Sequence, residues 1–136
     1  MSYGSKQIPT EIRQVTSERK VVISWNNGDR FEYSMEYLRI ACPCADCRGH
    51  TPSQRKLIDG KSDVTIRSIT PVGHYAVKIV FSDDHDSGVY SWESLYDLGQ
   101  GQQGYWQDYL EQLQVAGKRR RPSVFMIKPV AAVPQP

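Results

Sequence analysis

The chain has 136 residues, of which 39% are hydrophobic, and a formal net charge of +2. This length suits a single domain with its own core, and no apolar run approaches the roughly 20 residues of a membrane-spanning helix. The N-terminal residues lack the apolar centre of a signal peptide. We therefore expect a cytoplasmic protein without membrane contact, whose thiols stay reduced.

The charge is spread unevenly along the chain. Residues 118–136 carry five basic side chains and no acid, whereas residues 1–117 hold 12 basic and 15 acidic ones. A mildly acidic body is not typical of a nucleic-acid-binding surface. The basic run 118–121 is the sole candidate for contact with RNA, anionic lipid or an acidic partner, and we expect it to be solvated.

Residues 1–7 are expected to be disordered, and a single domain is expected over residues 8–117. Its first part is β-structure, with strands predicted over 8–16, 20–25 and 29–34 from alternating apolar residues. Asn26-Asn27-Gly28 predicts a hairpin turn between the last two strands. Ser34 is placed to cap a short helix over 34–41, which Pro43 should end where the cysteines begin.

The second part of the domain follows a polar segment, 48–62, that predicts a loop. Strands are expected over 64–73 and 75–81, then a short strand running into a helix within 89–98, then a loop over 99–104. Residues 105–117 have the period of an amphipathic helix that ends at Gly117. Residues 118–136 are expected to be a basic, Pro-rich tail, in which residues 124–127 could dock as a short strand.

Two stretches of the chain share one plan of strand, turn, strand, Tyr-Ser and a helix carrying leucine. In this internal repeat Trp25 aligns with Phe81, Tyr33 with Tyr90, and Leu38 with Leu95, with one extra residue in the second turn. We therefore expect an α+β fold. It is mainly antiparallel β-sheet, built from two repeated β-β-α units and a C-terminal amphipathic helix.

All three cysteines fall in the run CPCADC, as Cys42, Cys44 and Cys47. Thiolates at this spacing can hold a soft metal together, but three sulfurs lack one ligand of a tetrahedral zinc site. His50, His74 and His85 are the histidines that can complete it. His85 ranks first, because an aspartate among its neighbours could orient its second ring nitrogen, and His50 ranks second.

Other interpretations of the cysteines remain open at this point. Free cysteines are often small buried apolar residues, although three in six positions beside Pro43 argue against that role here. A redox Cys-x-x-Cys lacks its usual βαβ context. An iron–sulfur cluster usually takes four cysteines, so three with a histidine favour Zn²⁺, while a transient or shared cluster is the alternative.

The segments WNNGDRFEYSMEYLRIACPCADCRG and FSDDHDSGVYSWESL resemble the gamma-butyrobetaine hydroxylase-like N-terminal domain, long described as a domain of unknown function. The resemblance covers residues 8–98 and implies a structural zinc ion. Its implied ligands are Cys42, Cys44, Cys47 and His85. Two positions depart from the family pattern, since Asn27 stands for Asp and Asp84 for Gly. Asp84 is expected either to alter its turn or to offer a competing oxygen.

The resemblance implies an accessory or adaptor protein without hydroxylase activity, because that chemistry needs a separate domain with a 2-His-1-carboxylate iron site. None of the three histidines begins the usual His-x-Asp/Glu motif of that site. Related domains occur with iron–sulfur carrier ATPases and with dioxygenases, so a partner of one of these kinds is expected. Participation in iron–sulfur cluster assembly is the alternative function, and thiol oxidoreductase activity is a third.

Overall fold

The computed structural model describes residues 7–44, 47 and 55–122. The chain runs through β1 (Pro9–Val15), β2 (Lys20–Trp25), β3 (Arg30–Ser34), α1 (Met35–Ile40), β4 (Ile66–Val72), β5 (Ala76–Phe81), β6 (Gly88–Ser91), α3 (Trp92–Gln100) and α4 (Gln102–Ala116). These elements confirm the predicted α+β class. Within the described ranges, every helix is too short or too polar to cross a membrane.

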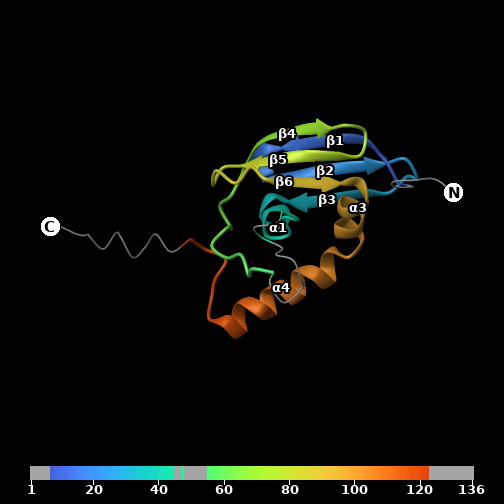
Figure 1. Cartoon of the computed structure of the whole chain (residues 1–136). Helices are drawn as coiled ribbons and strands as arrows, with labels where there is room; N and C mark the ends of the chain where they lie inside the picture. The colour runs from blue at the N-terminus through green and yellow to red at the C-terminus, as the bar shows by residue number, and fades with distance from the viewer. Residues whose placement is uncertain (1–6, 45–46, 48–54, 123–136) are drawn as a thin grey trace.

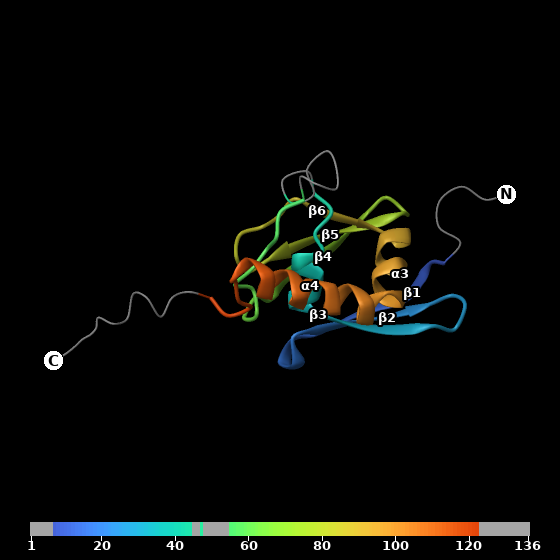
Figure 2. The ribbon, with the colours of Figure 1, turned by 90° about the horizontal axis from the view of Figure 1, so that it is seen from below.

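In the part of the chain that the structure describes, six strands form two antiparallel sheets, in the orders β1-β2-β3 and β4-β5-β6. The strands gather on one side of the molecule, and α1 and α4 lie on the other (Figures 1 and 2). The edge strands β1 and β4 are linked where Gln14 Nε2 donates a hydrogen bond of 3.0 Å to the Ile66 carbonyl. Residues of both sheets also belong to one hydrophobic core.

The two predicted β-β-α units are present, as β2-β3-α1 and β5-β6-α3. Ser34 and Ser91 cap the two helices in the same way, since each hydroxyl accepts a hydrogen bond from the backbone N–H three residues on. The units are also tied to each other. Tyr33 donates its hydroxyl to the Leu95 carbonyl of α3 at 2.7 Å, and Tyr90 donates to the Leu38 carbonyl of α1 at 2.5 Å.

The predicted loop over 99–104 is wrong, because α3 continues to Gln100 and α4 begins at Gln102. Gly101 still donates its N–H to the Asp97 carbonyl, and its own carbonyl accepts from Tyr105. The helical conformation is held by tertiary contacts that the glycine-rich sequence does not reveal. Gln102 Nε2 donates to the Glu32 carbonyl of β3 at 2.9 Å. The predicted end of α4 is confirmed, since Gly117 adopts φ 70° there.

Residues 118–121 are exposed, as expected, but Arg120 is also tied to the body of the protein. Its guanidinium binds both carboxylate oxygens of the buried Glu36 and lies 5.1 Å from the Trp106 ring centroid. The backbone also pairs, as Gly60 and Ser62 donate to the carbonyls of residues 119 and 120. A short sequence of arginines gives no sign of this pairing, because the partners lie far away in the chain.

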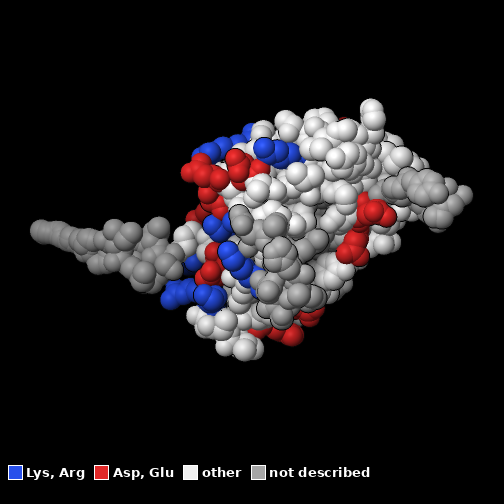
Figure 3. Space-filling model, in the orientation of Figure 1, with Lys and Arg blue, Asp and Glu red and all other residues white. Residues whose placement is uncertain are grey.

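Several expectations fall on residues outside the described ranges. They are the disorder of residues 1–6, the tail beyond residue 122 with its docking segment 124–127, and His50. On the face shown in Figure 3, described acidic and basic side chains are intermixed at the end where the chain passes into residues 123–136.

Candidate metal centre

Cys42, Cys44, Cys47 and His85 lie together, with one ligand atom from each within 4.8 Å of the others. His85 Nε2 is 3.1 Å from Cys42 Sγ, 3.5 Å from Cys44 Sγ and 3.7 Å from Cys47 Sγ. The three cysteines are buried, and His85 is partly buried. The four side chains that the sequence singles out therefore surround one point.

The spacing of the four ligand atoms fits a single four-coordinate ion. With a Zn–S distance of about 2.3 Å and a Zn–N distance of about 2.05 Å, the sulfur–nitrogen edge of a tetrahedron is about 3.6 Å. The three observed edges scatter around this value. Three thiols and an imidazole are soft and borderline donors, which suit zinc better than magnesium or calcium.

The end of α1 and the strand β6 place the first sulfur. Helix α1 stops at Ile40, and the Cys42 N–H donates to the Arg39 carbonyl at 3.2 Å. Gly88, the first residue of β6, lies against the sulfur. A Cβ atom on this glycine would lie 3.0 Å from Cys42 Sγ and 2.9 Å from the Tyr90 ring. The position therefore needs a residue without a side chain.

The turn between β5 and β6 places the histidine. The His85 carbonyl accepts from Phe81 N–H at 2.9 Å, and Asp84 adopts φ 66°. The substitution of Asp for Gly in this turn is thus accommodated in the left-handed region, which Asp enters more readily than most residues. The Asp84 carboxylate pairs with Arg67 at 2.7 Å, so it is not a competing ligand.

The sequence predicted that an aspartate would orient the ring of His85, but the neighbouring aspartates bind other groups. Within the described residues, none of their carboxylates bonds to the His85 ring. Asp83 instead accepts from the His85 backbone N–H and forms ion pairs with Arg39 at 2.9 Å and Lys61 at 2.6 Å. Burial works against ionisation of Asp83, but the two cations outweigh it and lower its pKa.

The thiols differ in how readily they ionise. Burial raises the pKa of Cys42 to about 12, so this thiol stays protonated until an ion displaces its proton. Burial also opposes ionisation of Cys44. Hydrogen bonds from Ser87 and from the Cys47 backbone outweigh it and lower the pKa of Cys44 to about 6. A metal would therefore meet a thiolate ready to bind at Cys44 and would displace the proton of Cys42.

Arg39 is a residue of this site that the sequence reasoning did not identify. Its side chain is buried, and Nη1 lies 3.7 Å from Cys47 Sγ. A signal was present in the internal repeat, which aligns Arg39 with Tyr96 and so replaces an aromatic ring by a cation. Gly88 and Ser87 were also not identified.

The second histidine candidate within the described residues, His74, lies on the exposed turn between β4 and β5, away from the cluster.

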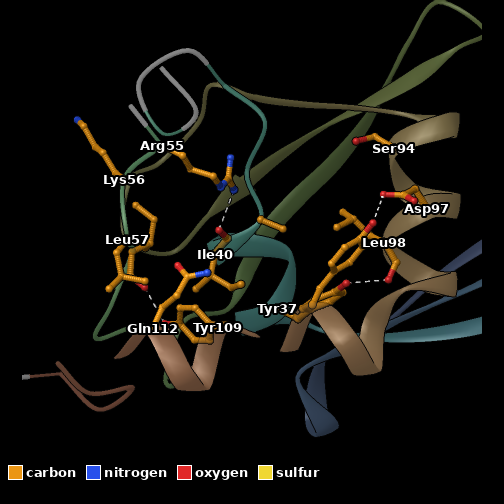
Figure 4. Close-up of a pocket in the computed structure, with 13 residues that line it drawn as sticks. Tyr37, Ile40, Arg55, Lys56, Leu57, Ser94, Asp97, Leu98, Tyr109 and Gln112 are labelled. Carbon is orange, nitrogen blue, oxygen red and sulfur yellow. Dashed lines mark hydrogen bonds between the residues drawn. The ribbon is translucent and has the colours of Figure 1, made fainter. Parts of the chain in front are cut away.

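A separate hollow of about 410 Å³ lies between α1, α3, α4 and residues 55–58 (Figure 4). Two tyrosines of this hollow form hydrogen bonds within its walls, since Tyr37 donates to the Leu98 carbonyl and Tyr109 to the Ile58 carbonyl. Arg55 Nη2 donates to the Ile40 carbonyl and, at 3.4 Å, to the Cys42 carbonyl. This wall of the hollow therefore supports the backbone of the cysteine segment.

Several solved structures resemble this chain, and three of them are compared with it. A crystal structure of a protein of unknown function from Acidithiobacillus ferrooxidans, of the DUF971 family, is 36% identical with a TM-score of 0.57, over 67% of this chain and 91% of that one. Two solution structures determined by NMR both have TM-scores of 0.76. One is 40% identical and covers 90% of this chain and 91% of its own, and the other is 32% identical and covers 95% and 98%.

Comparison with curated proteins gives no match. The sequence model of the family described as gamma-butyrobetaine hydroxylase-like, N-terminal, matches residues 12–96. This range contains all four members of the candidate metal centre, the first β-β-α unit, and the second unit as far as the first half of α3. The chain therefore belongs to the gamma-butyrobetaine hydroxylase-like N-terminal family.

Proposed function

We propose that this protein is a small zinc-binding accessory or adaptor protein, with a structural site formed by Cys42, Cys44, Cys47 and His85. The observation that supports it is the convergence of the four ligand atoms within 4.8 Å. A bound zinc ion would supply cross-linking rather than reaction chemistry. It would tie the segment after α1 to the turn between β5 and β6.

The donor set favours a structural role over a catalytic one. Catalytic zinc sites keep a position open for water, whereas sites with four protein ligands are closed. Here three sulfurs and one nitrogen would fill the four positions, and all three cysteines are buried. Binding to such a site adds directly to folding free energy, because the unfolded chain does not hold the four ligands together.

Iron–sulfur cluster handling is the alternative function. A cluster is larger than one ion, so its cysteine ligands sit further apart than ligands that share an ion. The ligand atoms here lie within 4.8 Å of one another, which favours a single ion. Anaerobic reconstitution separates the two proposals, since a cluster would give visible absorption and transfer to an apo-ferredoxin.

Thiol oxidoreductase activity is the third candidate function. It would require insulin reduction that depends on Cys44 and Cys47.

The proposed adaptor acts with a protein partner in the cytoplasm, where the three thiols stay reduced. The family's description, an N-terminal part of hydroxylase-like proteins, favours a catalytic protein as that partner. The candidates are an iron–sulfur carrier ATPase or a dioxygenase. Affinity capture with zinc-loaded protein from native extract, followed by identification of the bound proteins, tests this. Recovery of neither class would contradict the partner proposal.

Elemental analysis and chelation test the metal directly. The purified protein should carry about one equivalent of zinc, as a single Cys₃His site requires. Removing zinc with a chelator should lower the melting temperature. The Cys44→Ala variant should lack the metal and melt like the chelated wild type. Metal-free protein whose melting does not respond to a chelator or to added zinc would contradict the proposal.

A further inference from the structure

Arg39 is a buried cation at the edge of the metal centre. Only 7% of the residue is exposed, and its Cζ lies 6.0 Å from the Phe81 ring centroid. Its Nε donates to Asp83 Oδ2 at 2.9 Å, and its Nη1 approaches Cys47 Sγ at 3.7 Å. A buried charge is costly unless it is paired, so these two contacts determine what Arg39 does.

The Asp83 carboxylate does not fully neutralise the charge of Arg39. Asp83 also binds Lys61 Nζ at 2.6 Å, so one carboxylate faces two cations. This local group carries one positive charge in excess, and its buried member is the one that contacts sulfur. Three thiolates, a neutral imidazole and a divalent ion together carry one negative charge. The two groups would therefore neutralise each other.

The equivalent position of the other unit holds no cation. Tyr96 occupies the equivalent place in α3, and it reaches the equivalent turn of the other unit, where it bonds to Asn27 and Asp29. Its ring packs on Trp25 at 5.1 Å, as Arg39 lies near Phe81. An aromatic side chain thus makes the same helix-to-turn contact where no sulfur is near.

We infer that Arg39 is a positioning residue for the metal, which holds the Cys47 sulfur toward the ion and offsets the negative charge of the loaded site. Arg39 would act through N–H···S contact, and Asp83 would fix the orientation of its guanidinium. Such partners beyond the ligands commonly set metal affinity. The inference depends on the proposed zinc site and adds a residue that is not a ligand.

Metal competition measurements on single variants test this role. We compare zinc affinity, from competition with a colorimetric chelator, and the rate of zinc release to excess chelator. Arg39→Gln should bind zinc about 10–100-fold more weakly and release it faster. Arg39→Lys should recover part of the loss, because it keeps the charge without the planar fork. Cobalt-loaded Arg39→Gln should show a shifted sulfur-to-metal charge-transfer band.

Two variants serve as matched controls. Arg67→Gln removes a cation paired with Asp84 on the same turn, and Tyr96→Phe removes the equivalent contact in the other unit. Both should bind and release zinc like the wild type. A loss of affinity in the controls equal to that of Arg39→Gln would overturn the inference, since a general weakening of the fold would then explain it.

The remaining outcomes also decide the question. Wild-type affinity and release in Arg39→Gln would overturn this inference alone, whereas wild-type protein that binds no zinc would overturn the proposed function as well. If Arg39→Gln does not fold, the Asp83→Asn variant is measured instead. This change removes the carboxylate that orients the Arg39 guanidinium and keeps the guanidinium itself. Faster zinc release from Asp83→Asn than from Arg67→Gln supports the inference, and equal release overturns it.

Discussion

The two β-β-α units are built alike but meet different neighbours. In each, the residue before the turn donates its N–H across the turn, from Trp25 to Asp29 and from Phe81 to His85. Each turn then reaches the helix of the other unit. The first turn contacts α3 through Tyr96, and the second faces the end of α1. The same frame thus serves a polar contact on one side and a metal centre on the other.

The difference is clearest where each helix approaches the strand of the other unit. Phe31 of β3 lies so close to Gly99 of α3 that a Cβ on this glycine would be 2.3 Å from the ring. In the second unit the bulk is exchanged, since Gly88 of β6 lies against Cys42 after α1. The side chain of Cys42 therefore stands against a glycine, as the Phe31 ring does in the first unit.

The two units thus differ at equivalent positions while keeping the same frame. At the interface between β3 and α3, a phenylalanine ring packs against a glycine. At the interface between β6 and the end of α1, the four candidate ligands lie together. Stability of the first interface should thus be independent of metal, and stability of the second should depend on it. This division between a metal-independent and a metal-dependent interface can be tested with paired variants.

The largest difference is expected between His85→Ala and Asp29→Ala, which occupy equivalent turn positions. The histidine variant should lose bound zinc and the whole zinc-dependent increase in melting temperature, because three ligands remain. Asp29→Ala should keep zinc and lose about 1 kcal/mol of unfolding free energy, the worth of a hydrogen bond. Zinc content and denaturant unfolding measure both. Zinc retained at full occupancy by His85→Ala would contradict the division.

The paired glycines give the next largest effect. Gly88→Ala should weaken zinc binding, because its Cβ would press on Cys42 Sγ at 3.0 Å. Gly99→Ala should leave zinc affinity unchanged while lowering the unfolding free energy by about 1–3 kcal/mol through overpacking. Chelator competition and urea unfolding distinguish them. The division fails if Gly99→Ala releases zinc as readily as Gly88→Ala.

The helix caps should show the smallest effect and no difference between the units. Ser34→Ala and Ser91→Ala each remove a hydroxyl that accepts from a backbone N–H of the first helical turn. Each should cost about 1 kcal/mol of unfolding free energy, with zinc affinity unchanged. Thermal and urea unfolding measure the loss. A cost at Ser34 several times that at Ser91 would mean that the units are not energetically alike.

Local chemistry explains which parts of this molecule could be predicted. The strands follow from alternating apolar residues, and both caps follow from Ser placed before a helix. Three thiols limit the fourth ligand to one of three histidines. His85 was ranked first for its neighbouring aspartates, which in the structure bind other groups, and the family resemblance implied the same residue. In contrast, the continuation of α3 into α4 depends on the contact of Gln102 with β3, which no local pattern encodes. The links of Arg39 and Arg120 to distant acids are equally nonlocal.

X-ray absorption at the zinc edge of the purified wild-type protein tests the central claim most directly. The account predicts one zinc ion per chain with three sulfur neighbours at about 2.3 Å and one nitrogen at about 2.0–2.1 Å. The nitrogen contribution should disappear in His85→Ala. Protein without zinc, or zinc with a nitrogen neighbour that persists in His85→Ala, would contradict it.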